Sequence, residues 1–357
     1  MTTVLDIYPE RLRQFGRHEG TFVLVTTPDA SNSIVIHHQD ASYASYETVI
    51  MDRGERFEKV LHDRIPENAH VLAICPGAFF ESPSEALLGP RRKLMAMACN
   101  STPANLEVIR HFIGIMERTD PVEQASFSDT FFELLEESEE LRYVDAKHGT
   151  SATLQHLSDG LVWNQQAGPL EWGDQQIVPA GEISVLPVEI TEFSENLHLP
   201  LQGDIAFRGY PILHNGTPSY TRGDQRRIYE RLACLGKHAV IAHVEDGIIT
   251  SIKPADAGAE SAADMLNAMF EVDARYRIVW EVGHALNTSL DLLPGNHAMN
   301  EVYGGTDGCL HWGLGLTPFT QYHLDIISPD TTVYTDNGTI VLGVESGYKN
   351  DRMAASA

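Results

Sequence analysis

The first half of the sequence alternates short β-branched runs with segments of helical periodicity, and this alternation restricts the fold most. Runs at Thr21–Thr26 and Thr48–Met51 are bounded by polar residues, and His70–Cys75 is a continuous apolar run typical of a buried strand. Two amphipathic helices are predicted after them, one from Thr102 to Glu117 and one from Ser128 to about Leu141. The pattern predicts an α/β fold for this half.

The second half has the pattern of β-hairpins. Paired β-branched runs flank the turn sequences Asp246-Gly247 and Asp336-Asn337-Gly338, and one helix from about Ala259 to Val272 interrupts them. We therefore expect an α/β (α+β) protein. An α/β N-terminal domain at residues 1–165 would be followed by a mostly β, metal-binding C-terminal domain at residues 166–357.

The charge of the chain excludes some classes of partner. The sequence has 50 acidic and 25 basic residues, a formal net charge of −25 with its 16 histidines neutral. Such a field repels nucleic-acid phosphates and anionic lipid, so we expect neither nucleic acid nor membrane as a partner. The four cysteines form no CxxC pair, and no signal peptide or transmembrane run is recognised. A cytoplasmic protein with reduced thiols is expected.

The segment Tyr322–Ile326 carries a histidine and an aspartate two positions apart. In a strand, the period of two places His323 and Asp325 on one face. His311 lies twelve positions before His323, with glycines between them, so it can occupy a neighbouring strand. The pattern is compatible with a metal site or with an ordinary His–Asp hydrogen bond.

Two glutamates lie within apolar, strand-like segments. Glu281 is in the middle of Arg277–Gly283, and Glu182 follows Gly181 directly before an apolar run. A buried carboxylate needs a cation or a proton, although a strand-edge position or an arginine partner would also satisfy it. With the two histidines and the aspartate, these oxygen and nitrogen donors suit Zn²⁺, Mn²⁺, Co²⁺ or Fe²⁺. Three carboxylates favour two divalent ions over one.

Four segments resemble, in order, the metal-binding segments of the aminopeptidase T-like (thermophilic-type) metalloaminopeptidases. They are Ala180–Glu182, Glu281–Asn287, Gly308–Gly315 and Tyr322–Asp325. The resemblance implies a dinuclear centre in the second domain and a homodimer. The ligands that it implies are Glu182, Glu281, His311, His323 and Asp325. The tyrosine that follows the first histidine in those peptidases has no match between Trp312 and Pro318.

A more distant resemblance is to the 2,5-dihydroxypyridine dioxygenases. It rests on chain length, on His323-Leu-Asp325-Ile and loosely on Phe80-Glu81-Ser82-Pro83. That family implies one Fe²⁺ held by two histidines and an aspartate. Here Glu281 stands at the position of the family's other histidine.

The leading hypothesis is a metal-dependent hydrolase that cleaves an amide or peptide-like small molecule through a metal-activated water. Glu182 and Glu281 would be catalytic as well as metal-binding. The alternatives are an iron-dependent oxygenase acting on a small metabolite and a non-catalytic, metal-stabilised binding protein. Four further residues are candidates for contacts with a substrate, namely Glu81, His284, His297 and Tyr322.

Overall fold

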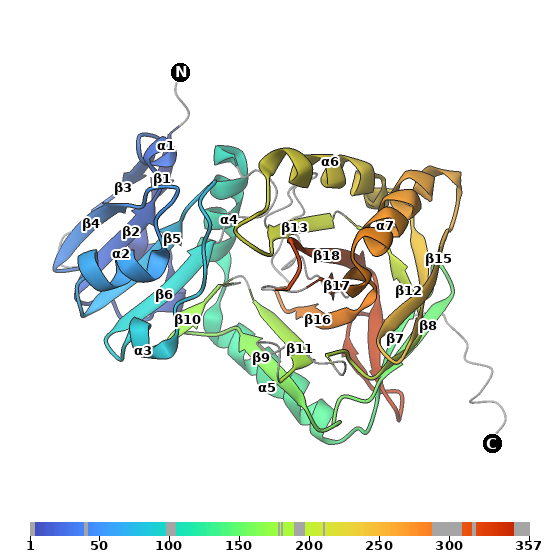
Figure 1. The fold of residues 1–357 in the computed structure, drawn as a ribbon. Helices are drawn as coiled ribbons and strands as arrows, with labels where there is room; N and C mark the ends of the chain where they lie inside the picture. The colour runs from blue at the N-terminus through green and yellow to red at the C-terminus, as the bar shows by residue number, and fades with distance from the viewer. Residues whose placement is uncertain are drawn as a thin grey trace.

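A computed structural model of the chain shows an N-terminal α/β part beside a larger, mostly β part (Figure 1). The structure describes residues 4–38, 42–97, 105–177, 179, 181–188, 197–209, 211–287, 309–315 and 319–345. The predicted fold class, with an α/β beginning and a mostly β continuation, is confirmed.

The N-terminal part is built on five parallel strands in the order β10-β6-β5-β2-β4. Side chains of the central strands are buried on both faces, as the apolar runs predict. The predicted strand at Thr21–Thr26 has those bounds. The strands are β2 (Thr21–Thr26), β4 (Ser45–Ile50), β5 (Ala69–Ile74), β6 (Arg92–Met97) and β10 (Gln175–Gln176).

Helices cover both faces of this sheet. Helix α4 (Leu106–Arg118) packs Ile109 and Phe112 against Leu24 and Leu72 on one face. Helix α2 (Phe57–Arg64) packs on the other face. The remaining elements here are β1 (Leu5–Ile7), α1 (Pro28–Ser31), β3 (Ile34–Ile36), α3 (Glu85–Leu88) and the 3₁₀ turns Pro9–Arg11 and Arg13–Phe15.

The larger part contains two antiparallel sheets. The first has six strands in the order β13-β18-β17-β16-β11-β9 and carries the predicted metal ligands. Its strands are β9 (Leu161–Gln166), β11 (Glu182–Pro187), β13 (Pro211–Asn215), β16 (Val279–Ala285), β17 (Cys309–Leu314) and β18 (Tyr322–Pro329).

The second sheet has seven strands in the order β15-β14-β12-β8-β7-β19-β20. One apolar cluster joins the two sheets, with Val282 and Trp312 from the first and Tyr143 and Phe207 from the second. The strands are β7 (Leu141–Asp145), β8 (Thr150–Leu154), β12 (Leu201–Phe207), β14 (Val240–Glu245), β15 (Ile248–Pro254), β19 (Thr332–Thr335) and β20 (Ile340–Leu342).

Both hairpins expected from the turn sequences are present. Strands β14 and β15 pair across Asp246 and Gly247, whose φ values of 49° and 71° are those of a tight hairpin turn. Strands β19 and β20 pair across the second turn sequence.

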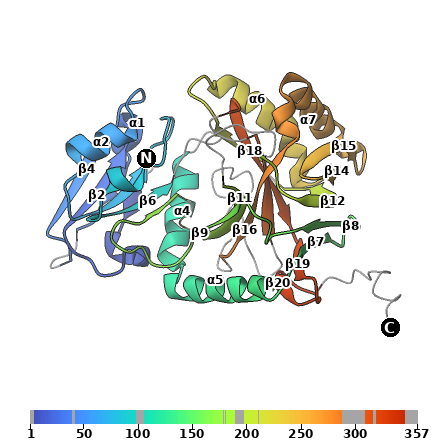
Figure 2. The same cartoon turned by 60° about the horizontal axis from the view of Figure 1, so that its bottom comes forward.

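Three longer helices flank the β sheets. They are α5 (Pro121–Glu136), α6 (Arg222–Leu232) and α7 (Glu260–Val272), with 3₁₀ turns at Ala233–Gly236, Ala257–Ala259 and Ala274–Arg277. Figure 2 shows α5 alongside β9 and β16. The Phe131 ring lies 5.9 Å from that of Trp163 and 5.2 Å from that of His284, so α5 covers the side of the six-stranded sheet that faces the core.

The predicted helix from Ser128 to Leu141 was wrong in its bounds. Helix α5 begins seven residues earlier, because the Asp120 carboxylate accepts hydrogen bonds from the backbone N–H groups of Val122 and Glu123 and Pro121 follows it. It ends at Glu136, and Leu141 begins β7. The start predicted at Thr102 for the first helix lies outside the described residues. Helix α4 itself is capped by Asn105, which accepts from the Val108 N–H.

Successive strands between residues 141 and 176 belong to different sheets. Strands β7, β8 and β9 belong to the antiparallel sheets, whereas β10 pairs with β6 of the parallel sheet. The predicted domain boundary at residue 165 stays a prediction.

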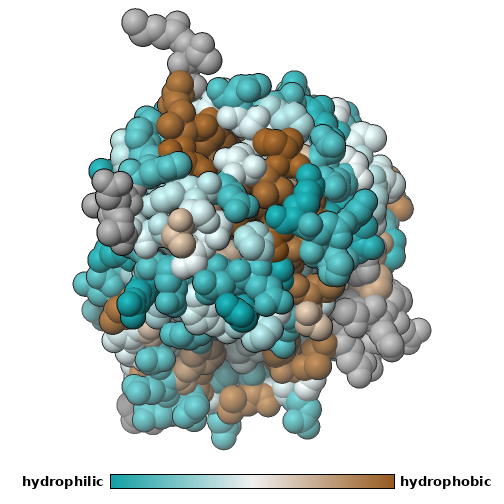
Figure 3. Space-filling model, turned by 90° about the vertical axis from the view of Figure 1, so that its left-hand side faces the viewer, coloured by the Kyte–Doolittle hydropathy of each residue, from teal (hydrophilic) through white to brown (hydrophobic). Residues whose placement is uncertain are grey.

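Among the described residues, no helix has the length and apolarity needed to cross a membrane. On the face of the N-terminal part that Figure 3 shows, apolar residues form strips between hydrophilic ones, and Val4 and Val35 are exposed apolar side chains of this part.

Candidate metal centre

The five predicted ligands lie on four adjacent strands of the six-stranded sheet. The order of these strands is β18-β17-β16-β11. Gly313 of β17 pairs with Asp325 on one side and Glu281 on the other, and Gly283 of β16 pairs with His311. Because paired residues share a face and side chains alternate along a strand, all five candidates are on one face. The five are Glu182, Glu281, His311, His323 and Asp325.

The opposite face of the same strands supplies the hydrophobic core. The residues that alternate with the candidates, such as Leu310, Trp312, Leu324 and Val282, belong to the cluster that joins the two antiparallel sheets. A polar face can therefore be assembled without placing charge in that core.

Two glycines provide the space for the side chains of the centre. A Cβ at Gly283 would lie 2.0 Å from Cε1 of His311, which is shorter than any van der Waals contact. A Cβ at Gly313 would lie 2.8 Å from Cβ of Glu281 and 3.2 Å from Cε1 of His323. Any larger residue at either position would displace a candidate ligand.

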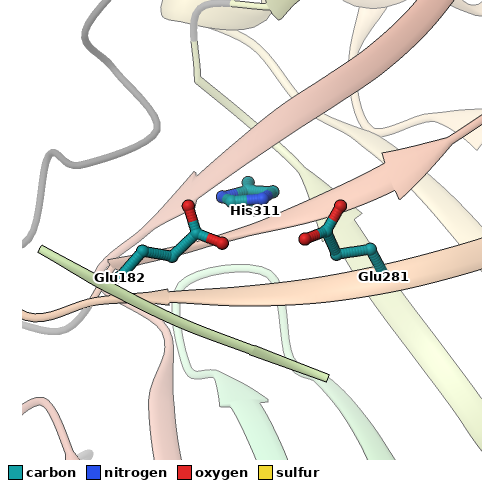
Figure 4. Close-up of side chains that lie close together, drawn as sticks. All are labelled: Glu182, Glu281 and His311. Carbon is teal, nitrogen blue, oxygen red and sulfur yellow. The ribbon is translucent and has the colours of Figure 1, made fainter. Parts of the chain in front are cut away.

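The candidate ligands form two triads that share one residue. Glu182, Glu281 and His311 place one donor atom each within 4.8 Å of one another, and Glu281, His323 and Asp325 do the same. In Figure 4, the carboxylates of Glu182 and Glu281 point toward one another beside the His311 ring. Glu281 can thus offer oxygen atoms to both groups.

The donor set fits divalent metal ions. Asp325 and His311 are each 2% exposed and Glu182 is 4% exposed, so several charges are held away from water. Among the described residues, the basic groups within 4.0 Å of Glu281 and Asp325 are histidines. Buried carboxylates need cations, and imidazole with carboxylate is a donor set typical of Zn²⁺, Mn²⁺, Co²⁺ and Fe²⁺.

Burial and mutual charge shift the pKa values of these groups in different directions. Burial raises the pKa of Glu281 above its usual value, and Asp325 adds to this shift. Burial disfavours the charged forms of His323 and Asp325, but their attraction outweighs it. The pKa of His323 is therefore raised to about 9, and the pKa of Asp325 is held well below its usual value.

A backbone carbonyl orients the His323 ring. Nδ1 of His323 lies 2.5 Å from the Gly315 oxygen, to which its N–H donates. Nε2 then faces the carboxylates, 3.0 Å from Oδ1 of Asp325 and 3.6 Å from Oε2 of Glu281. A hydrogen bond from the distal nitrogen is the usual way in which proteins fix a histidine for metal binding.

The sequence prediction missed His214. This residue is on β13 directly opposite His323, with its Nε2 3.3 Å from Oδ2 of Asp325 and its ring stacked at 5.8 Å on that of His323. His214 therefore holds Oδ2 of Asp325, the oxygen that does not face His323. The sequence pattern for this strand is weak, because β13 spans only Pro211–Asn215 and begins with a proline.

Two predicted substrate contacts face away from the centre. The His284 side chain is buried in the core, where Nδ1 lies 2.9 Å from the Ile183 oxygen and Nε2 lies 3.0 Å from the Tyr143 hydroxyl. The Tyr322 hydroxyl donates to Asp224 on α6 over 3.0 Å. Both residues alternate with candidate ligands along their strands, so the same period that gathers the ligands directs these side chains elsewhere.

A third predicted contact, Glu81, belongs to neither triad of candidate ligands. The Glu81 side chain is half-exposed in the N-terminal part, 3.7 Å from Arg56. His297 lies outside the described residues.

Comparisons with known proteins show a fold relationship. No protein-family model and no curated protein matches the sequence. A solved 2,5-dihydroxypyridine dioxygenase from Pseudomonas putida KT2440 is similar with a TM-score of 0.55 and 13% identity, over 96% of this chain and 95% of that one. AmpT from Thermus thermophilus is similar with a TM-score of 0.44 and 12% identity, over 92% and 93%.

Proposed function

We propose that the chain is a metal-dependent hydrolase with a dinuclear centre, acting on an amide or peptide-like bond of a small molecule. Glu182, Glu281, His311, His323 and Asp325 would hold two divalent ions. The observation that carries the proposal is the position of Glu281, which belongs to both triads of donor atoms. A carboxylate that belongs to two ligand groups is suited to holding a pair of neighbouring ions.

Bound ions would supply a water of lowered pKa and polarise the carbonyl oxygen of the substrate. The chain's own groups supply the rest. One of the two glutamates, or a neighbouring group that the sequence does not identify, would accept the proton that the attacking water loses and return it to the leaving amine. His214 and the Gly315 carbonyl keep Asp325 and His323 in place.

A second candidate function is an iron-dependent dioxygenase. His323 places Nε2 3.0 Å from Oδ1 of Asp325, so these two residues would supply one histidine and the carboxylate of the two-histidine, one-carboxylate set of non-haem iron oxygenases. The similarity of the fold to a 2,5-dihydroxypyridine dioxygenase supports this alternative. In this case Glu281 would stand at the position of the second histidine, beside His323 and Asp325, and Glu182 and His311 would be additional to the iron ligands.

Metal content measured on purified variants distinguishes a centre with one metal ion from a centre with two. We expect about two ions per chain in the unmodified protein, about one in Glu182→Gln, and almost none in Glu281→Gln because both triads lose a donor. Glu85→Gln, which changes an exposed glutamate on α3, is the matched control and should keep the full content. Fewer than about one ion per chain after loading, or an unchanged content in Glu281→Gln, would contradict the dinuclear centre.

The reaction class needs a separate experiment. Small amides and short peptides should be hydrolysed equally well with and without oxygen, and the activity should disappear in Asp325→Asn. Consumption of oxygen on addition of Fe²⁺ and a small dihydroxylated aromatic compound, with no anaerobic turnover of any amide, would replace the hydrolase by the dioxygenase.

A further inference from the structure

A cavity of about 440 Å³ lies between the N-terminal part and helix α6. Its walls come from α1, which follows β2, from the loops that follow β4 and β5, from the start of α4 and from α6. None of the five candidate metal ligands lines it. Its volume is within the range of cavities that hold small metabolites.

The cavity lies at the topological switch point of the parallel sheet, between the adjacent strands β2 and β5. The connection after β2 leads to β4 on one side, and the connection after β5 leads to β6 on the other. Asp29 and Ala30 follow β2, Pro76 and Gly77 follow β5, and all four line the cavity. A crevice outside the carboxyl ends of two strands that diverge in this way is where open α/β sheets bind ligands.

The lining is positively charged, in contrast to the chain as a whole. It contains three arginines, Arg53, Arg222 and Arg226, and one acidic residue, Asp29. This gives a local charge of +2 in a chain whose formal net charge is −25. Arginine is the side chain best suited to hold a carboxylate or phosphate, because its planar group donates two parallel hydrogen bonds.

Two of the arginines, Arg53 and Arg226, are exposed to an incoming anion. The ion pair between Arg53 and Asp29 is exposed, at 68% and 71%, and exposed pairs contribute little, so a ligand can replace Asp29. Arg226 is exposed and has no hydrogen-bond or ion-pair partner among the described residues. Arg222 is fixed by its stacking on the Tyr220 ring and by a 3.0 Å hydrogen bond to Gln225.

The opposite wall adds an apolar surface and a further source of positive potential. Leu106 and Ile109 of α4 line the cavity, so the apolar part of a small molecule can contact them. Leu106 is also the first residue of this 13-residue helix, and the N-terminal end of a helix attracts anions.

We propose that this cavity is a second binding site, which takes a small organic molecule through a carboxylate or phosphate group held by Arg53, Arg222 and Arg226. The site goes beyond the proposed hydrolase function and does not depend on it. The ligand is anionic and partly apolar, and its charged group occupies the arginine side of the cavity.

Calorimetric titration with inorganic phosphate and with benzoate tests the site. Protein treated with a chelator is used, so that anions cannot bind to metal ions. At low salt, we expect saturable binding of one or both probes, weakened about tenfold or more in Arg226→Gln. Stronger binding of phosphate indicates a phosphorylated ligand, and stronger binding of benzoate indicates a carboxylate.

Two controls make the result decisive. Arg91→Gln removes an exposed arginine that lies outside the cavity, and it should bind as the unmodified protein does. Arg226→Gln should keep its metal content, because it touches no candidate ligand. Absence of binding of both probes at millimolar concentration, or equal weakening in Arg91→Gln and Arg226→Gln, would overturn the proposal.

Discussion

Gly283 and Gly313 have no side chain, and the candidate centre depends on this. Gly313 lies between Glu281 and Asp325 on the neighbouring strands, and Gly283 lies beneath the His311 ring. Neither has a positive φ, so the requirement is for space rather than for backbone conformation.

We predict that Gly313→Ala lowers metal affinity by about tenfold or more while the protein stays folded. The added methyl group would press on Cβ of Glu281, which both triads share, and on the His323 ring of the second triad. Titration with Zn²⁺ and a competing chelator measures the affinity, and circular dichroism reports the fold. Gly54→Ala is the control, because a Cβ there meets nothing within 4 Å. An unchanged affinity in Gly313→Ala would show that the centre tolerates the displacement.

A histidine of the N-terminal part makes stability depend on pH. Burial, with nearby Lys93 and His18, lowers the pKa of His70 from 6.5 to about 3. Its Nδ1 lies 2.9 Å from the Tyr43 hydroxyl, and its ring stacks on Phe15. The folded protein therefore keeps this ring neutral at pH values where an unfolded chain protonates it.

Because the unfolded state takes up the extra proton, stability falls as the pH decreases below 6.5 toward 3. We expect His70 to account for a loss of about 3 kcal/mol between pH 7 and pH 4.5. Urea unfolding at the two pH values measures this loss in the free energy of unfolding. The variant His70→Gln keeps an acceptor for Tyr43, and its free energy of unfolding should decrease by about 3 kcal/mol less over the same pH interval. An equal loss in both proteins would show that other groups cause the acid sensitivity.

Residue-scale features could be predicted where a single rule applies. The period of two along a strand correctly places His323 and Asp325 on one face and Tyr322 on the other. It could not show that His214 lies opposite His323, because the pairing of β13 with β18 joins segments more than a hundred residues apart. His284 shows the same limit, since a buried histidine in the core and one in a site have the same sequence pattern.

At the scale of elements, the start of α5 depends on Asp120. This carboxylate accepts from two backbone N–H groups and also receives a 2.9 Å hydrogen bond from Arg13. An aspartate followed by proline is a sequence signal for a helix start, and it lies before the apolar periodicity on which the prediction of a helix from Ser128 rested.

Asp120→Ala should lower the urea midpoint of unfolding, because two helix N–H groups and Arg13 lose their acceptor. Asp120→Asn should cause a smaller decrease, since its amide oxygen still caps the helix while the charge is lost. Ser126→Ala, within the helix, should be nearly neutral. Equal midpoints for Asp120→Ala and Ser126→Ala would show that the cap contributes nothing.

At the scale of the whole molecule, the sequence predicted the fold class but not the membership of the sheets. Alternating runs and turn sequences identify strands one by one, and most of the strands expected are present. The pairing of β10 with β6, and of β9 with β11, depends on contacts between distant segments, which local patterns do not contain.

The acidity of the chain predicts a dependence of stability on salt. A formal charge of −25 makes exposed carboxylates repel one another, and dissolved ions screen this repulsion. We expect the urea midpoint to rise when sodium chloride is increased from low to physiological concentration. Sodium sulfate at equal ionic strength is a useful comparison, since it also strengthens apolar burial. A fall in the midpoint with sodium chloride would mean that ion pairs outweigh the repulsion.

The division of the six-stranded sheet into a polar face and a core face has a consequence for the history of such proteins. Every candidate ligand occupies a strand position of one parity, and the core uses the other, so a ligand can be exchanged without disturbing the packing that holds the sheets together. A lineage can therefore gain, lose or replace metal ligands one at a time while each intermediate remains folded. Chains that share this scaffold need not share a chemistry, and ancestry is a poor guide to the reaction of any one of them.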